Sequence, residues 1–194
     1  LEGASHPEEL IVQASKLGYK ALGITDKMSL AGVVRAYRES QRKDCHTRIL
    51  VGCELVTQDD VHMLAYPKNL QGYGQISTII TRARRHAAKG SYHLEASVME
   101  TMLRDVILIL PGYAHDTTQM PSLIDWGVKH WGSHFYVGVG TCGHGNDQQR
   151  MAAEAYMART RAVGLIACNH TIMHTKERQP IADFLQAIQK GCCL

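Results

Sequence analysis

A carboxylate and a histidine stand close to the ends of two apolar runs that are typical of strands. Glu54 lies near the end of the run 49–56, and His62 lies near the start of the run 61–66. A carboxylate buried in such a place needs a cation or hydrogen-bond donors beside it. Carboxylate and imidazole are also ligands for divalent metals, so the pair could bind metal or form a structural hydrogen bond. Both interpretations stay open at this point. Asp26, which follows the apolar run 21–25, could also belong to a site, or it could cap a helix or stand in a turn.

Two other segments have the residue types of a site and are less specific. The run 138–143 is rich in glycine, as in phosphate-binding loops, but it lacks the Gly-Lys-Ser/Thr ending and the dinucleotide spacing, so a turn after a strand is expected. Cys142 stands near His144, but the sequence shows no third residue that would orient a thiol nucleophile. The run of Arg82, Arg84 and Arg85 is typical of a solvated helix end, or of a surface that contacts DNA phosphates.

Size and composition fit one globular domain, or a fragment cut from a larger protein. The chain has 194 residues, of which 45% are hydrophobic, and its formal net charge is +3. That charge is too small to indicate a general nucleic-acid binder. The six cysteines have no C-x-x-C spacing, no apolar run approaches ~20 residues, and no secretory signal is present, so we expect a cytoplasmic protein without a membrane span.

Strands and helices alternate along the whole chain, which predicts a mainly parallel α/β architecture with its site at the carboxyl ends of the strands. Ser5 and Glu8 have capping-box spacing and predict the first helix, with Leu10, Ile11, Ala14 and Leu17 on its apolar face. The turn 57–60 predicts a hairpin. Further strands are expected at 21–25, 49–56, 61–66, 106–110, 135–139 and 165–168. Further helices are expected at 30–43, about 70–89 with Asn69 or a neighbour as its cap, 121–130, 147–162 and about 181–188.

Several segments together resemble the polymerase-and-histidinol-phosphatase (PHP) domain of bacterial C-family DNA polymerases, and the error-prone branch in particular. They are Gly3-Ala4-Ser5-His6-Pro7-Glu8, Leu22-Gly23-Ile24-Thr25-Asp26, Val51-Gly52-Cys53-Glu54-Leu55, Gly72-Tyr73 leading to Ile80-Thr81-Arg82-Ala83-Arg84-Arg85, and Met173-His174 through Pro180, Asp183 and Ile188. The resemblance implies a distorted seven-stranded β/α (TIM-like) barrel. Residues 1–194 would form a single PHP domain without the barrel's first strand, because that strand precedes the Gly-Ala-Ser segment.

The resemblance also implies a cluster of two or three divalent metals, of which this chain keeps only part. Glu2, Glu54, His62 and His170 match ligand positions, and Asp26, Lys27 and His174 would line the cleft. Lys27 stands where metal-binding members have a histidine, and an ammonium group cannot ligate while it is charged. Ile172 occupies another ligand position, within His170-Thr171-Ile172-Met173-His174. We therefore expect zinc, manganese or magnesium to be lost or only partly retained, and Lys27 could instead pair with Glu54.

The function implied by the resemblance is that of the N-terminal PHP domain of an error-prone, translesion DNA polymerase. Nucleotidyl transfer and DNA binding would then reside in domains outside this chain, and the other domains of the polymerase would be its partners. Two alternatives stay open. One is an active metal-dependent phosphoesterase or 3'-5' exonuclease that uses the four ligand positions. The other is a stand-alone binding module descended from this domain.

Overall fold

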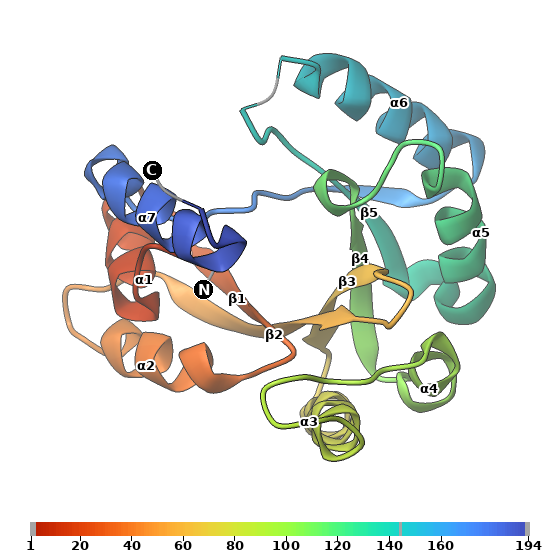
Figure 1. Cartoon of the computed structure of the whole chain (residues 1–194), viewed down its shortest axis with the longest axis horizontal. Helices are drawn as coiled ribbons and strands as arrows, with labels where there is room; N and C mark the ends of the chain where they lie inside the picture. The colour runs from red at the N-terminus through yellow and green to blue at the C-terminus, as the bar shows by residue number, and fades with distance from the viewer. Residues whose placement is uncertain (1–2, 144, 193–194) are drawn as a thin grey trace. The chain divides into compact units, whose positions relative to one another are not determined.

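The structure, a computed structural model, describes residues 3–143 and 145–192 (Figure 1). The chain forms two compact units. The first unit comprises residues 1–24, 31–51 and 170–194, and the second comprises residues 25–30 and 52–169. Strands β1 (Ala21–Lys27) and β2 (Arg48–Val56) each contribute residues to both units. All candidate residues on the hairpin therefore fall in the second unit.

In the first unit, helix α1 (Pro7–Lys16) packs against helix α2 (Ala31–Ser40), with Ile11 and Ala36 fully buried. The 3-10 turn η3 (Lys176–Arg178) and helix α7 (Gln179–Lys190) complete the unit. The prediction that Ser5 and Glu8 form the capping box of α1 is wrong by one residue. The N-cap is His6, whose backbone N–H donates to Glu9 Oε2 at 2.8 Å. The Ser5 hydroxyl instead forms a hydrogen bond with the His174 ring. Glu8 Oε1 accepts a hydrogen bond from Arg35 Nε at 2.9 Å.

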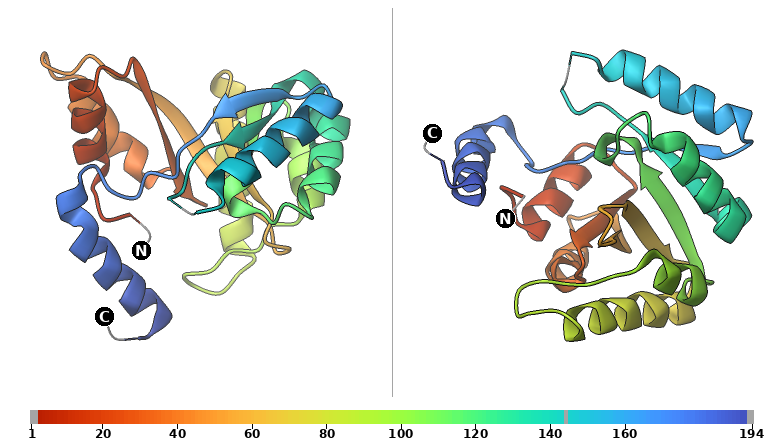
Figure 2. Two further views of the ribbon diagram at one scale, coloured as in Figure 1. Left: turned by 90° about the horizontal axis from the view of Figure 1, so that it is seen from above. Right: turned by 45° about the vertical axis from the view of Figure 1, so that its right-hand side comes forward.

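The second unit holds the remaining elements, and most of them lie where the periodicity predicts them. They are β3 (His62–Pro67), α3 (Leu70–Arg85), α4 (Ala96–Met102), β4 (Val106–Pro111), the 3-10 turn η1 (Gly112–Ala114), α5 (Met120–Trp131), the 3-10 turn η2 (Gly132–His134), β5 (Phe135–Val139), α6 (Asp147–Thr160) and β6 (Gly164–Ala167). The short helix α4 is the one of these helices that the sequence reasoning missed. Helices α5 and α6 lie side by side and pack on β4, β5 and β6 (Figures 1 and 2).

The six strands follow the order β1-β2-β3-β4-β5-β6. Strand β2 pairs antiparallel with β3, which confirms the predicted hairpin, while β4–β5 and β5–β6 are parallel. The expectation of a mainly parallel sheet needs correction, because β3–β4 is antiparallel as well and the sheet is mixed. The reason lies in the β3–β4 connection. Helices α3 and α4 lie in this connection and bring the chain back to the end of the sheet at which β3 stops. Pro67, the last residue of β3, therefore pairs with Val106, the first residue of β4.

A tight contact fixes that return. Asn69 caps α3 by accepting a hydrogen bond from the Gly72 amide at 2.9 Å, in line with the cap predicted from the sequence. Gly72 packs so closely on the Asp105 carbonyl that a Cβ at this position would lie 2.0 Å from the oxygen. Only glycine allows α3 to begin this close to the start of β4. The hydrophobic core of the unit includes Leu55, Met63, Leu108 and Leu110 from strands β2, β3 and β4.

Among the described residues, no helix has both the length and the apolar character needed to span a bilayer.

Candidate functional site

The β2–β3 hairpin brings Glu54 and His62 into direct contact. In its register Val56 faces His62, and Glu54 precedes Val56 by two residues. Glu54 and His62 are thus diagonal neighbours on one face of the hairpin. The His62 Nδ1 atom lies 2.6 Å from Glu54 Oε1, and Glu54 is only 7% exposed. The structure therefore supplies the hydrogen-bond donor that a buried Glu54 requires.

His62 has a second carboxylate at its other ring nitrogen. His62 Nε2 lies 3.2 Å from Asp60 Oδ1, in the turn between the two strands. The hydrogen bond to Glu54 raises the pKa of His62 above its usual value, against the opposing effects of burial and of the nearby Lys27 charge. A histidine that donates from both nitrogens is the charged imidazolium. The arrangement thus favours a positively charged ring between two carboxylates.

His115 completes this cluster, and the sequence reasoning did not identify it. It follows η1, and its Nε2 lies 3.0 Å from the backbone oxygen of His62. The two rings meet edge to face, with centroids 6.0 Å apart. Burial lowers the pKa of His115, so the neutral ring that donates from Nε2 is favoured. The one signal in the sequence was a histidine four residues beyond the end of an apolar strand.

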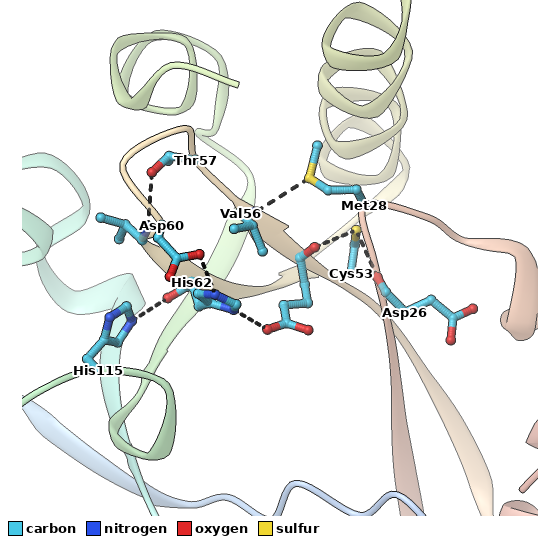
Figure 3. Close-up of polar contacts among 10 residues, drawn as sticks. Asp26, Met28, Cys53, Val56, Thr57, Asp60, His62 and His115 are labelled. Atoms are coloured by element: carbon cyan, nitrogen blue, oxygen red, sulfur yellow. Dashed lines mark hydrogen bonds and ion pairs between the residues drawn. The ribbon is translucent and has the colours of Figure 1, made fainter. Parts of the chain in front are cut away.

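The end of β1 is tied to the end of β2 beside this cluster. The Cys53 thiol donates to the Asp26 carbonyl at 3.4 Å (Figure 3). The Met28 amide donates to the Glu54 carbonyl at 2.8 Å. Burial raises the pKa of Cys53 to about 12, which keeps it a neutral thiol. Asp26 and Lys27 are both half-buried at this strand end. These contacts hold the segment that carries the predicted cleft residues against the hairpin.

The three arginines of the basic run on α3, Arg82, Arg84 and Arg85, have different surroundings. The Arg84 guanidinium donates from Nε and Nη2 to the Met28 carbonyl, at 3.1 and 2.9 Å. Arg82 is exposed and its Nη1 lies 3.3 Å from the Met102 sulfur, while Arg85 is exposed near the end of the helix. Arg84 thus has a structural contact that the sequence did not reveal. A role for these three residues in DNA binding stays a prediction.

Two other predicted site residues, His170 and His174, belong to the first unit. The His174 Nδ1 atom lies 2.7 Å from Ser5 Oγ, and the His174 backbone N–H donates to the same oxygen at 2.9 Å. Glu2 lies outside the described residues. The structure therefore joins Glu54 to His62, and the set of four metal ligands stays a prediction.

A second polar cluster, on α6, was missed altogether. Arg150 donates to Glu154 Oε1 at 2.7 Å and to Asp147 Oδ1 at 3.0 Å. The other oxygen of Asp147 accepts hydrogen bonds from the backbone amides of Cys142 and Gly143, both at 2.8 Å. The Glu154 carboxylate packs against Gly112, where a Cβ would lie 2.3 Å from it. The cluster thus contacts the segments that follow β4 and β5.

Groups near Glu54 that could act as ligands are held in their neutral forms. Burial raises the pKa of the Tyr113 phenol, and the nearby Glu54 carboxylate adds to the effect. Burial likewise raises the pKa of Cys168. A thiol that binds metal is deprotonated and usually has a lowered pKa. Over residues 3–143 and 145–192, no three side chains of the His, Cys, Asp and Glu types are grouped so that they could hold a metal ion.

Comparison with known proteins gives the family and the fold. A family model described as the PHP domain matches residues 1–120. The chain is 36% identical over 193 residues to the error-prone DNA polymerase of Methylococcus capsulatus, and 35% identical over 197 residues to that of Dechloromonas aromatica. These matches cover 98% and 97% of this chain but only 18% of each polymerase.

Among solved structures, an amidohydrolase from Chromobacterium violaceum with bound SO4 and no metal superposes with a TM-score of 0.63. The superposition covers 89% of this chain and 84% of the amidohydrolase, at 13% sequence identity. A likeness at this identity establishes the fold alone. The α/β class expected from the alternation of strands and helices is thereby confirmed.

Proposed function

Since the chain belongs to the PHP domain family, we propose that it is the N-terminal PHP domain of an error-prone, C-family DNA polymerase and has a structural role there. The sequence identity to two such polymerases supports this assignment. Residues 1–194 would form one PHP domain, a distorted barrel without its first strand. Nucleotidyl transfer, translesion synthesis and contact with DNA would then be carried out by other parts of a cytoplasmic polymerase.

The contact between Glu54 and His62 is the observation that supports a structural role. A metal ligand needs a free lone pair, and a charged imidazolium has none. Here the hydrogen bond to Glu54 raises the pKa of His62. The resemblance to the PHP family also implies that Lys27 stands where metal-binding members have a histidine. The cluster therefore contains its own positive charge. The described residues do not fit a multinuclear metal site, and we propose that hydrogen bonds and ion pairs replace it.

The alternative is a working metal-dependent phosphoesterase or 3'-5' exonuclease. The observation in its favour is that a carboxylate and an imidazole, both good ligands for zinc and manganese, meet at the ends of β2 and β3. Metal binding would require His62 to lose its proton and Glu54 to exchange its partner. Glu2 and His170 would have to supply further ligands.

Metal analysis and a cleavage assay decide between the two functions. The parent polypeptide, with the residues that precede Leu1, would be incubated with zinc or manganese, desalted and analysed for bound metal. Hydrolysis of bis(p-nitrophenyl) phosphate and of a labelled single-stranded oligonucleotide would be measured alongside. We expect less than stoichiometric metal and no turnover that depends on it. Stoichiometric metal, with turnover abolished by H62N and retained by H93N, would establish the phosphoesterase instead.

The polymerase assignment has a separate test. Primer extension by the parent polypeptide on an intact template and on one with an abasic site should yield extended products, whether or not metal binds to the PHP region. A gene that encodes no polymerase segment beside these 194 residues would contradict the assignment and favour a stand-alone binding module.

A further inference from the structure

Helix α7 has a stripe of large apolar side chains that its own unit leaves uncovered. Ile181, Phe184, Leu185 and Ile188 follow the spacing of one helix face, and the sequence suggests that this face is buried. In the structure, Ile181, Phe184 and Ile188 are 42%, 55% and 53% exposed. We refer to these three residues as the α7 face. The helix is as predicted, but its apolar side is open to solvent.

The residues of α7 that are buried are small. Ala182 and Ala187 are 8% and 9% exposed, and the strongest packing partner of the helix is the turn η3 just before it. The buried positions of the helix are thus alanines, Leu185 is half-buried, and the three residues of the α7 face are exposed. Burial of a large aliphatic or aromatic side chain stabilises a protein far more than burial of an alanine. This orientation is unfavourable unless something else covers the face.

The surroundings of the α7 face resemble those of an interface. Asp183, Gln186, Gln189 and Lys190 are exposed on the same helix, and Gln179 donates to Asp183 at 2.7 Å. A contiguous apolar patch with a polar rim is typical of a surface that meets another protein or domain. The other large exposed side chains of the described region are more scattered. The nearest rivals are two pairs that each cover a single turn, Val34 and Tyr37 on α2 and Leu70 and Tyr73 on α3.

We propose that the α7 face docks on a part of the same polymerase polypeptide that lies outside residues 1–194, and this rests on the proposed function. The polymerases that the chain matches are more than five times as long as the matched region, which is 18% of each. Freely associating partners usually contribute about 20–30 residues each to an interface. Three large side chains are few by that measure. A covalently linked partner needs less, because the linkage supplies a high effective concentration.

Hydrogen–deuterium exchange tests the docking. Exchange of the amides of α7 would be compared between the 194-residue chain and the parent polymerase. We expect exchange at least ten-fold slower in the parent, since docking suppresses local opening of the helix. The double variant F184D/I188D should abolish that difference. The matched control is V34D/Y37D, which places two charges on an exposed helix face of the same unit and should leave the protection of α7 unchanged.

Two outcomes overturn the proposal. Equal exchange of α7 in both proteins would show that the rest of the polymerase does not cover the face. Self-association of the 194-residue chain that F184D/I188D abolishes, measured by sedimentation velocity, would assign the face to a second copy. If the double variant does not fold, F184A/I188A gives the same comparison with milder changes. A parent that extends primers but leaves α7 unprotected refutes the docking alone, whereas a parent without polymerase sequence refutes the proposed function as well.

Discussion

Two buried carboxylates of the second unit, Glu54 and Glu154, have partners of different kinds. Glu54 is 7% exposed and contacts an imidazole, while Glu154 is 1% exposed and contacts a guanidinium. The Glu54 contact joins two strands of a hairpin. The Glu154 contact joins two residues one helical turn apart on α6, which Asp147 extends to the loop after β5.

The difference between the partners determines what each pair can do. An arginine keeps its charge at any pH that a protein experiences, so Glu154 has a permanent counter-charge. A histidine can release its proton near neutral pH and can then ligate a metal. The Glu154 cluster is thus suited to structure alone. The Glu54 cluster keeps the chemistry of a ligand pair even though its hydrogen bonds favour the charged ring.

The largest effect should follow from removal of Arg150. R150M leaves Glu154 without a cation at a site that is almost fully buried, and it also removes a partner of Asp147. Loss of one partner from a buried ion pair typically costs about 3–5 kcal/mol of unfolding free energy. Urea unfolding followed by circular dichroism measures the loss.

Arg159 provides the control for that substitution, because it lies on the same helix and is exposed. R159M should change the unfolding free energy by less than about 0.5 kcal/mol. A loss of stability in R150M no larger than in R159M would show that Glu154 is neutral in the folded protein and needs no counter-charge.

A smaller effect is expected where the Glu154 carboxylate packs on Gly112. In G112A the new methyl group would overlap the carboxylate, which should cost about 1–3 kcal/mol as overpacking does in other cores. The added methyl should be tolerated once the carboxylate is removed. G112A should therefore cost much less in an E154A background, and a double-mutant cycle of urea unfolding measures the coupling.

The control for the cycle is G74A, which adds a methyl group where nothing lies within 4 Å of a Cβ. G74A and E154A should be additive. Additive effects of G112A and E154A would contradict the packing described for the two residues.

The Glu54 pair should differ from the Glu154 pair in its dependence on pH. Because Glu54 raises the pKa of His62 above the usual 6.5, the stability from this pair is fully present below pH 6.5 and is lost as the pH rises through the raised pKa. E54Q should lower the pKa of His62, measured by NMR titration of its ring proton. At pH 6 it should cost about 1.5–3 kcal/mol of unfolding free energy, as expected for a hydrogen bond between charged groups.

His115 acts in the opposite direction, since its pKa is lowered and stability falls as the pH drops below 6.5. The titration of His62 must therefore be read from its own resonance. The exposed pair His93 and Glu95, 3.7 Å apart, serves as the control. E95Q should leave the pKa of His62 unchanged, and an equal shift in both variants would mean that Glu54 acts through net charge alone.

The hairpin was predictable because its signals are local. A polar turn between two apolar runs specifies antiparallel pairing, and the pairing alone makes Glu54 and His62 neighbours. The mixed sheet was not predictable in the same way. A helix between two strands usually indicates a parallel crossover, but here the second helix α4 and the return of the chain at Asp105 make β3 and β4 antiparallel.

The sequence reasoning missed residues whose contacts are not indicated by a family motif or by a characteristic spacing in the sequence. His115 reaches the carbonyl of His62 across 53 residues, and a backbone oxygen has no sequence pattern. Glu154 and Arg150 have the ordinary spacing of an exposed ion pair on a helix, and the spacing does not reveal that Glu154 packs on Gly112. The α7 face differs in the opposite way: the periodicity suggests a buried face, but the structure leaves its side chains exposed. Periodicity identifies an apolar face and does not say what covers it.

The smallest effect should come from Asp60, the second carboxylate beside His62. Its side chain is 88% exposed, so water and salt screen its charge. Its backbone has a positive φ of 58°, a conformation that asparagine adopts readily, so D60N removes the charge without adding strain. We expect a fall in the pKa of His62 smaller than that caused by E54Q, and a change in unfolding free energy below about 0.5 kcal/mol. The NMR titration of His62 should show the D60N shift shrinking in high salt and the E54Q shift persisting. If D60N lowered the pKa more than E54Q, the exposed carboxylate would be the one that holds the proton on His62, and the contrast between a buried ligand pair and a permanent ion pair would fail.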